Sequence, residues 1–206
     1  IGLLHLIGVL RDMKNPPRFL FLENVLNFEV SRCHDLLLQV LRDRGYRVEE
    51  YLVSPCDPWI GIPNDRLRYY LIAKLSGTGD DVSGHIIRSF SEIYGESSEQ
   101  VGQISEYLDP EAAQDASLAV PDRYILDYKE YRHDVVHPSS RRSTTFTKAY
   151  GSNYIIGTGS FLQTSRLDLT EYAKDDPDVL MTLGLKFFSP SEVARLHAFP
   201  EVQLRA

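Results

Sequence analysis

Cysteine is scarce in this sequence, and long apolar runs are missing from it. The two cysteines, Cys33 and Cys56, are too few for a disulfide framework, so we expect a reducing compartment. No apolar stretch reaches the roughly 18 residues that indicate a membrane span. The apolar N-terminal residues lack the basic flank and the small-residue cleavage site of a signal peptide. These absences predict a globular protein that is neither secreted nor embedded in a membrane.

An excess of positive charge is also missing. The 22 basic and 29 acidic residues give a net charge of −7. That balance argues against a generally basic nucleic-acid binder but leaves room for a local basic patch. The sequence contains no internal repeat, and it begins at Ile1 rather than at a methionine. We therefore expect a piece of a longer protein, large enough for one domain with a smaller lobe.

The N-terminal third carries alternating helix and strand signals. Apolar residues at helical spacing predict a helix over residues 3–10. Residues 19–22 are all apolar, which predicts a fully buried strand. A helix over 31–44 and strands over 48–53 and 68–75 follow. Strand, helix and strand within about 35 residues form a βαβ unit, which predicts a mostly parallel sheet.

After the third strand the sequence becomes more polar and less periodic. The stretch over residues 76–84 is linker-like, and residues 77–185 are expected to form a lobe of short strands and loops. The last segment has clear helix signals. Ser189 is suited to the N-cap position, Pro190 to the first helical position, and Glu192 completes a capping box.

Polar side chains follow the first strand, at the end of a sheet where ligands bind in open α/β folds. Glu23 and Asn24 stand at this end, and Arg66 and Arg68 precede the third strand on one side of an extended segment. A carboxyl kept protonated by burial can donate to a ring nitrogen, and a guanidinium can donate to a ring carbonyl. The combination predicts a pocket for a pyrimidine, although each residue alone is more often part of a surface ion pair.

Several motifs resemble those of the cytosine-5 methyltransferase family. The segment "FLENV" resembles the Glu-Asn-Val motif of that family. The segment "GIPNDRLRYYLIAK" resembles its Gly-x-Pro-Gln-x-Arg-x-Arg motif, with Asn64 in place of Gln, and "FSPSEVARLHAFP" resembles its late helix motif. "TFTKAYGS" is similar to the Cys-Phe-Thr-Lys-x-Tyr-Gly signature of the tRNA-aspartate branch, with Thr145 in place of Cys. The resemblance spans nearly the whole sequence.

Three motifs of the family do not occur in these residues. They are the Pro-Cys-Gln motif of the nucleophile, the glycine-rich cofactor loop and the Gly-Asn-Ser motif that follows the late helix. Cys56 in "SPCDPW" is not expected to replace the nucleophile, because the family's cysteine precedes Glu-Asn-Val. The 206 residues alone are therefore expected to be inactive. No cofactor-binding residue is identified.

The resemblance implies a fold and a reaction. The fold is α/β, with the C-terminal half of a Rossmann-like class I methyltransferase sheet in residues 1–76. A smaller target-recognition lobe is inserted over 77–185, and a helix over 186–206 returns to the catalytic domain. The implied reaction methylates C5 of a cytosine with S-adenosyl-L-methionine through a covalent cysteine adduct. The implied substrate is the anticodon-loop cytosine-38 of tRNA-Asp, in the cytoplasm and/or nucleus, with no metal and no membrane involved.

The resemblance also gives roles to individual residues. Glu23 is expected to hydrogen-bond N3 and the exocyclic amine of the base, Arg68 to hold O2, and Arg66 to support this catalytic pocket. The residues expected to bind the substrate are Asn24, Val25, Arg141, Arg142, Thr145, Phe146, Thr147, Lys148, Tyr150 and Gly151.

Alternatives remain open both for single residues and for the function of the whole protein. The basic side chains near the signature can instead form a solvated face, and Phe146 and Tyr150 can pack inside the lobe rather than stack on bases. At the level of the whole protein, a DNA cytosine-5 methyltransferase and a non-catalytic nucleic-acid-binding relic stay open.

Overall fold

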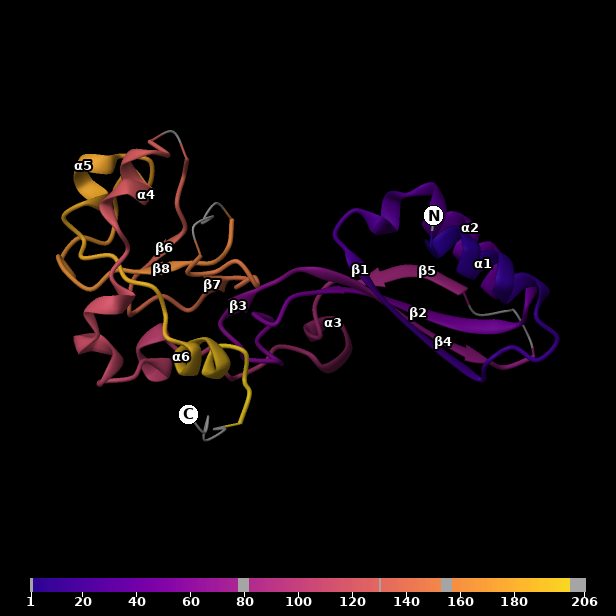
Figure 1. Ribbon diagram of the computed structural model, residues 1–206. Helices are drawn as coiled ribbons and strands as arrows, with labels where there is room; N and C mark the ends of the chain where they lie inside the picture. The colour runs from indigo at the N-terminus through magenta and orange to yellow at the C-terminus, as the bar shows by residue number, and fades with distance from the viewer. Residues whose placement is uncertain (1, 78–81, 130, 153–156, 201–206) are drawn as a thin grey trace. The chain divides into compact units, whose positions relative to one another are not determined.

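The computed structural model describes residues 2–77, 82–129, 131–152 and 157–200. The chain divides into two compact units, each described here by itself (Figure 1). The sheet unit contains residues 1–54 and 67–97, and the lobe unit contains residues 55–66 and 98–206.

A four-stranded sheet forms the centre of the sheet unit, in the order β1-β4-β2-β5. Its strands are β1 (Phe19–Val25), β2 (Tyr46–Val53), β4 (Arg68–Leu75) and β5 (Val82–Ile87). β4 is antiparallel to both β1 and β2, whereas β5 is parallel to β2. The prediction of a mostly parallel sheet is therefore wrong for the pairs that β4 makes. The predicted crossover from β1 to β2 exists, but β4 lies between these two strands in the sheet and runs antiparallel to both.

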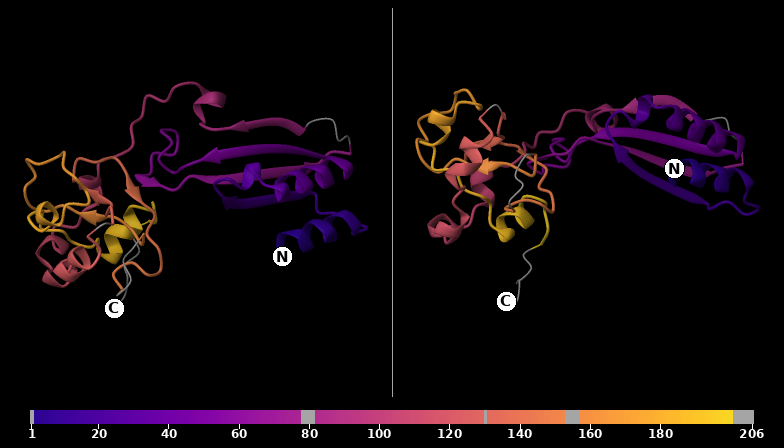
Figure 2. Two further views of the ribbon diagram at one scale, coloured as in Figure 1. Left: turned by 90° about the horizontal axis from the view of Figure 1, so that it is seen from above. Right: turned by 45° about the horizontal axis from the view of Figure 1, so that its top comes forward.

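Two helices cover one face of this sheet (Figure 2). They are α1 (Gly2–Asp12) and α2 (Arg32–Asp43), preceded by the short η1 (Phe28–Val30), and a further short helix, α3 (Ser91–Tyr94), follows β5. The Oγ of Ser31 accepts a hydrogen bond from the N–H of His34 and so caps α2, as its sequence predicts. Gly45 follows the helix with a φ of 77°, which a glycine adopts without strain.

β1 is an edge strand rather than the fully buried strand predicted. Phe19, Phe21 and Val25 have exposed fractions of 60, 66 and 58%, while Leu20 and Leu22 pack against the core. Only the face covered by the helices is buried. An apolar run predicts a strand, but it does not reveal whether both faces are covered.

β5 occupies part of the stretch predicted as a linker. It pairs with β2, so the sheet extends past the predicted start of the lobe at residue 77. Residues 78–81 of that stretch lie outside the described residues. The boundaries of the two compact units therefore differ from those of the predicted domains. The roles of those domains remain predictions.

Short elements make up the lobe unit, which confirms the short strands and loops predicted for this region. Two parallel pairs of strands join β3 (Asn64–Asp65) to β7 (Ser143–Thr144) and β6 (Val135–Val136) to β8 (Phe161–Leu162). The short helices of the unit are η2 (Ile104–Tyr107), η3 (Ala112–Gln114), η4 (Ala116–Leu118), α4 (Asp122–Leu126), α5 (Pro177–Leu180) and α6 (Pro190–Arg195).

The N-terminus of α6 has the capping box that its sequence predicts. The Oγ of Ser189 accepts from the N–H of Glu192 at 3.2 Å, and the carboxylate of Glu192 accepts from the N–H of Ser189 at 2.7 Å. Phe188 and Leu196 anchor the two ends of the helix in a buried cluster with residues of η2, β6 and β8. α6 therefore belongs to the lobe unit.

Candidate functional site

Glu23 and Arg68 meet on neighbouring strands of the sheet unit. In the register of β1 and β4, Glu23 lies opposite Tyr70 and Val25 lies opposite Arg68, so Glu23 and Arg68 share one face of the sheet. The Oε1 atom of Glu23 is 3.8 Å from the Nε atom of Arg68. An ion pair of this length at a partly exposed site contributes at most about 1 kcal/mol to folding. Exchanging this contact for one with a ligand therefore costs little.

Two expectations about Glu23 are corrected. β1 continues to Val25, so Glu23 lies within the strand rather than after its end. Its side chain is 45% exposed, so the sheet unit does not supply the burial that the prediction invoked. Both differences follow from the edge position of β1, whose outer face no helix of the unit covers.

Asn24 and Arg66 are the other two residues predicted beside Glu23. The Oδ1 atom of Asn24 accepts a hydrogen bond from the N–H of Val25 at 2.9 Å, which orients the amide along the strand. Arg66 belongs to the lobe unit. Its convergence with Glu23 stays a prediction.

A buried polar network lies next to Arg68 in the chain. The hydroxyl of Tyr69 donates to Oε1 of Glu50 at 2.8 Å, and Nε2 of His34 is 2.5 Å from the same oxygen. All three residues are buried. Burial, together with the hydrogen bond to Glu50, raises the pKa of Tyr69, so the hydroxyl stays a neutral donor. The network holds β4 in place at the residue that follows Arg68.

Sequence reasoning missed this network, although a signal for it exists. Side chains of β2 alternate, and Glu50 occupies an inward position between Val48 and Leu52. A glutamate on the inward side of a strand needs a buried partner, because an unpaired buried carboxylate is costly. That pattern could have directed attention to Tyr69 and His34.

In the lobe unit, the "GIPND" segment and the signature segment lie side by side (Figure 1). Asn64 and Asp65 of β3 pair with β7, and the hydroxyl of Ser143 donates to the carbonyl of Pro63 at 2.8 Å. The amide of Asn64 donates to Nε2 of His197, just after α6, at 3.1 Å. Three of the segments that carry the resemblance therefore meet in this unit.

The predicted phosphate-binding arginines already have partners. Arg142 lies 3.1 Å from Asp134 and 3.7 Å from Asp65, and Arg141 donates to the carbonyl of Val101. Burial raises the pKa of Asp134, but the hydrogen bond from Ser160 and the charge of Arg142 outweigh it and lower the pKa. A phosphate at Arg142 would thus compete with the side chains of Asp134 and Asp65.

Lys148 lies on the segment that follows β7 and is exposed, as are Arg141 and Arg142, but it forms no ion pair with a carboxylate of the described residues. The neighbouring Thr147 is held by its N–H, which donates to the carbonyl of Thr158 at 2.8 Å. Gly151 is exposed with a φ of 75°, which favours glycine at this turn. Thr145 is partly buried, and contacts of these residues with a substrate stay predictions.

Phe146 and Tyr150 pack inside the lobe unit. Their ring centroids are 4.8 Å apart in an edge-to-face arrangement. The hydroxyl of Tyr150 donates to the carbonyl of Ser160 at 2.7 Å and accepts from the N–H of Phe188 at 2.8 Å. Burial raises the pKa of Tyr150, which keeps this hydroxyl protonated. The packing alternative accounts for both rings, and stacking on bases stays a prediction.

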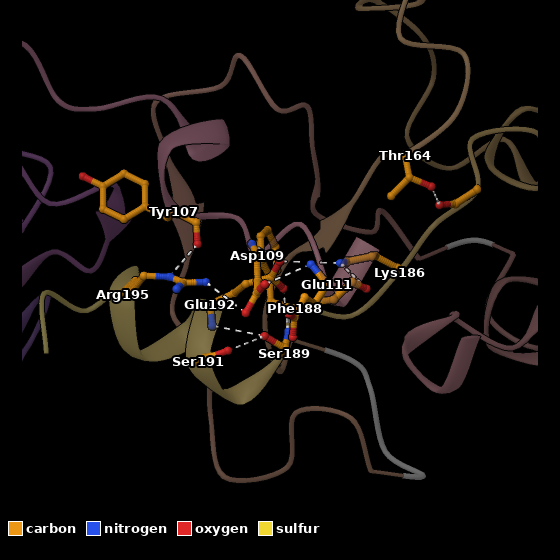
Figure 3. Close-up of polar contacts among 12 residues, drawn as sticks. Tyr107, Asp109, Glu111, Thr164, Lys186, Phe188, Ser189, Ser191, Glu192 and Arg195 are labelled. Atoms are coloured by element: carbon orange, nitrogen blue, oxygen red, sulfur yellow. Dashed lines mark hydrogen bonds and ion pairs between the residues drawn. The ribbon is translucent and has the colours of Figure 1, made fainter. Parts of the chain in front are cut away.

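A buried ion pair holds α6 to the rest of the lobe unit (Figure 3). The Nζ atom of Lys186 is 3.5 Å from Oε1 of Glu192 and donates to the carbonyl of Ala112 at 3.1 Å. The carboxylate of Glu192 also accepts from the N–H of Asp109 at 3.0 Å. The sequence identified Glu192 only as a capping residue, because Asp109 and Ala112 are distant in the chain and Lys186 lies outside the helix.

A cavity of about 370 Å³ lies beside Lys186, and its lining decides whether S-adenosylmethionine could bind there. Its lining combines apolar side chains with Asp115 and Asp122, and no glycine-rich turn leads from a strand into a helix there, as nucleotide-type cofactors require. The described residues do not fit the cofactor, and none is assigned to it. In the same residues, no group of His, Cys, Asp and Glu side chains could hold a metal ion, and no helix could span a membrane.

Comparison with known proteins gives a consistent result. A family model described as C-5 cytosine-specific DNA methylase matches residues 5–202. The tRNA (cytosine(38)-C(5))-methyltransferase of Homo sapiens is 30% identical, over 96% of this chain and 66% of its own length. The DNA (cytosine-5)-methyltransferase of Dictyostelium discoideum is also 30% identical, over 96% of this chain and 60% of its own length.

The solved structures agree with this result. The crystal structure of the S. pombe Dnmt2 methyltransferase has a TM-score of 0.71 and 31% identity, and the match covers 96% of this chain and 59% of that one. This likeness confirms the predicted α/β fold. The chain spans less than two thirds of the length of each of these relatives. Because the family model matches almost all of its residues, the chain belongs to the C-5 cytosine-specific DNA methylase family, as its motifs predicted.

Proposed function

We propose that the protein containing this chain methylates C5 of a cytosine in tRNA, and that its target is cytosine-38 in the anticodon loop of tRNA-Asp. The observation that carries the proposal is the match of 96% of the chain to relatives named tRNA (cytosine(38)-C(5))-methyltransferase. We place the reaction in the cytoplasm and/or nucleus, where the two cysteines of the chain would stay reduced.

S-adenosylmethionine, when bound, supplies the methyl group. The nucleophilic cysteine that forms the covalent adduct is proposed to come from outside these 206 residues, because the Pro-Cys-Gln motif does not occur in them. The residues present then have the task of holding the base. Glu23 and Arg68 suit it, because a carboxyl and a guanidinium on one face of the sheet complement the edge of cytosine.

In this proposal the carboxyl of Glu23 hydrogen-bonds N3 and the exocyclic amine of cytosine, while Arg68 donates to O2. Charge that develops on the ring during attack at C6 is then stabilised by groups already in place. Their mutual contact of 3.8 Å is weak, so exchanging it for contacts with the base costs little. An anticodon-loop cytosine is unpaired, so moving it out of its stack costs little.

The test uses the full-length gene product that contains these residues. Transfer of a radiolabelled methyl group from S-adenosylmethionine is measured to a tRNA-Asp transcript, to the same transcript with uridine at position 38, and to duplex DNA of matched length. We expect label only on the first substrate. Equal labelling of the uridine transcript would overturn the assignment of the target base.

The same experiment separates the alternatives. A DNA methyltransferase is favoured by the Dictyostelium discoideum relative, and label on duplex DNA in excess of tRNA would support it. A non-catalytic relic would label nothing, provided that the full-length protein is folded and binds tRNA. Residues 1–206 alone are proposed to be inactive, and label transferred by them would bring Cys56 back as a candidate nucleophile.

A further inference from the structure

The loop between β2 and β4 carries the only tryptophan of the chain. Trp59 is 45% exposed, and the adjacent Ile60 is 39% exposed. Single exposed apolar residues are common on protein surfaces, so exposure alone decides nothing. The hydrogen bonds that order the loop and the basic side chain near it are more informative.

Asp57 fixes the backbone that presents these two side chains. Asp57 is itself buried, and its Oδ1 atom accepts from the N–H of Trp59 at 3.0 Å. Its carbonyl accepts from the N–H of Ile60 at 2.8 Å, and the N–H of Ile62 donates to the carbonyl of Pro55 at 3.0 Å, which closes the loop. Trp59 thus sits on a turn that is already ordered, so contact with a partner costs little backbone entropy.

An exposed basic side chain follows the strand pair that this loop leads into. The chain continues from the loop into β3, which pairs with β7. Lys148 is exposed on the segment that follows β7, whereas Arg142, directly before β7, is held by the carboxylates of Asp65 and Asp134. A half-exposed aromatic ring combined with cations is the arrangement that binds single-stranded nucleic acid, where bases stack on rings and cations contact the backbone.

We propose that Trp59 stacks on an unpaired base of the bound RNA. The inference rests on the proposed function, which supplies RNA as the substrate, and it adds a contact that none of the family motifs contains. Bases in a duplex already stack on their neighbours and present no free face, whereas loop bases do. Trp59 therefore favours a hairpin loop over a paired stem.

The single tryptophan makes the proposal directly measurable. The 206-residue chain is titrated with an RNA hairpin that has a seven-nucleotide, cytosine-containing loop, and the emission of Trp59 is followed. Anisotropy of the same RNA, labelled with a fluorophore, gives binding independently. We expect saturable quenching of Trp59 with the same dissociation constant as the anisotropy, and no quenching by a duplex of equal length.

Variants identify the contact as stacking. Stacking of a base on an aromatic ring is worth enough that Trp59→Ala should weaken hairpin binding about fivefold or more. Trp59→Phe keeps a ring and should stay within about threefold of the parent. Ile60→Ala is the matched control, because it removes an equally exposed apolar side chain from the same loop, and it should also stay within about threefold. Circular dichroism checks that each variant is folded.

The outcomes are distinguishable. If anisotropy reports hairpin binding but the emission of Trp59 does not change, the inference is overturned and the proposed function stands. If Ile60→Ala weakens binding as much as Trp59→Ala, the loop contributes apolar contact rather than stacking, and the inference is overturned as well. If neither signal responds to RNA, RNA binding by this chain fails, and the inference fails with it.

Discussion

Replacing Lys148 by alanine is expected to reduce the salt dependence of RNA binding, whereas replacing Arg142 is not. The difference follows from their surroundings. Lys148 is exposed, while Arg142 lies against the carboxylates of Asp134 and Asp65. Both carboxylates compete with a phosphate for the guanidinium of Arg142, so a phosphate that approaches this side chain releases few additional counterions.

The magnitude comes from counterion release. Each phosphate of a single strand that a cation neutralises contributes roughly 0.7 to the slope of log affinity against log salt concentration. Lys148→Ala should lower the slope by about this amount. The ratio of the parent's affinity for RNA to that of the variant should therefore fall about 2.5-fold between roughly 50 and 200 mM salt. Arg142→Ala should change the slope by less than about 0.3.

The assay is anisotropy of a labelled anticodon stem–loop at several salt concentrations, with the 206-residue chain. Arg166→Ala is the control for net charge, because it removes one exposed positive charge from the same unit at a distance in sequence from the signature segment. Arg142→Ala should instead lower the free energy of unfolding in urea by about 1 kcal/mol, since Asp134 then loses one of its two nearby cations and keeps Lys174. The reasoning is refuted if Arg142→Ala lowers the salt slope as much as Lys148→Ala does.

Three further outcomes are expected. Glu192→Gln should lower the free energy of unfolding in urea by about 3 kcal/mol, because it strands the buried ammonium of Lys186, and adding Lys186→Met should recover part of that loss. In the full-length enzyme, Glu23→Gln should reduce kcat far more than it raises the KM for tRNA, and a near-normal kcat would remove Glu23 from the mechanism. The lowered pKa of Asp134 stabilises the fold above the pKa of about 3.9 of an unfolded aspartate, and this contribution is lost as pH falls through the folded value. Urea titrations from pH 6 downward should therefore show a weaker loss of stability in acid for Asp134→Asn than for the parent.

Local chemistry made the helix ends predictable. The cap at Ser189 depends on residues within four positions, and it forms as the sequence indicates. The third predicted strand, residues 68–75, coincides with β4, since its run of Tyr, Leu and Ile is not interrupted by a turn residue. These features need no knowledge of the rest of the chain.

Features that depend on distant partners were not predictable in this way. The direction of β4 and the edge position of β1 depend on how the strands pair, and the pattern within each strand does not contain that information. Asp65 and Ala112, which contact Arg142 and Lys186 in addition to nearer carboxylates, come from distant segments of the chain, so these contacts could not be read from the sequence. In the candidate site, the family motifs predicted the meeting of Glu23 with Arg68, but they carried no information on its exposure.

The short "GIPNDRLR" segment explains why one motif can serve two units. Its Asn64 and Asp65 pair with β7 in the lobe unit, and its Arg68 begins β4 beside Glu23 in the sheet unit. Only Arg66 and Leu67 lie between the two strands in the chain. The segment therefore contributes residues to both compact units, and the pattern within the motif could not show that its two halves pair with different partners.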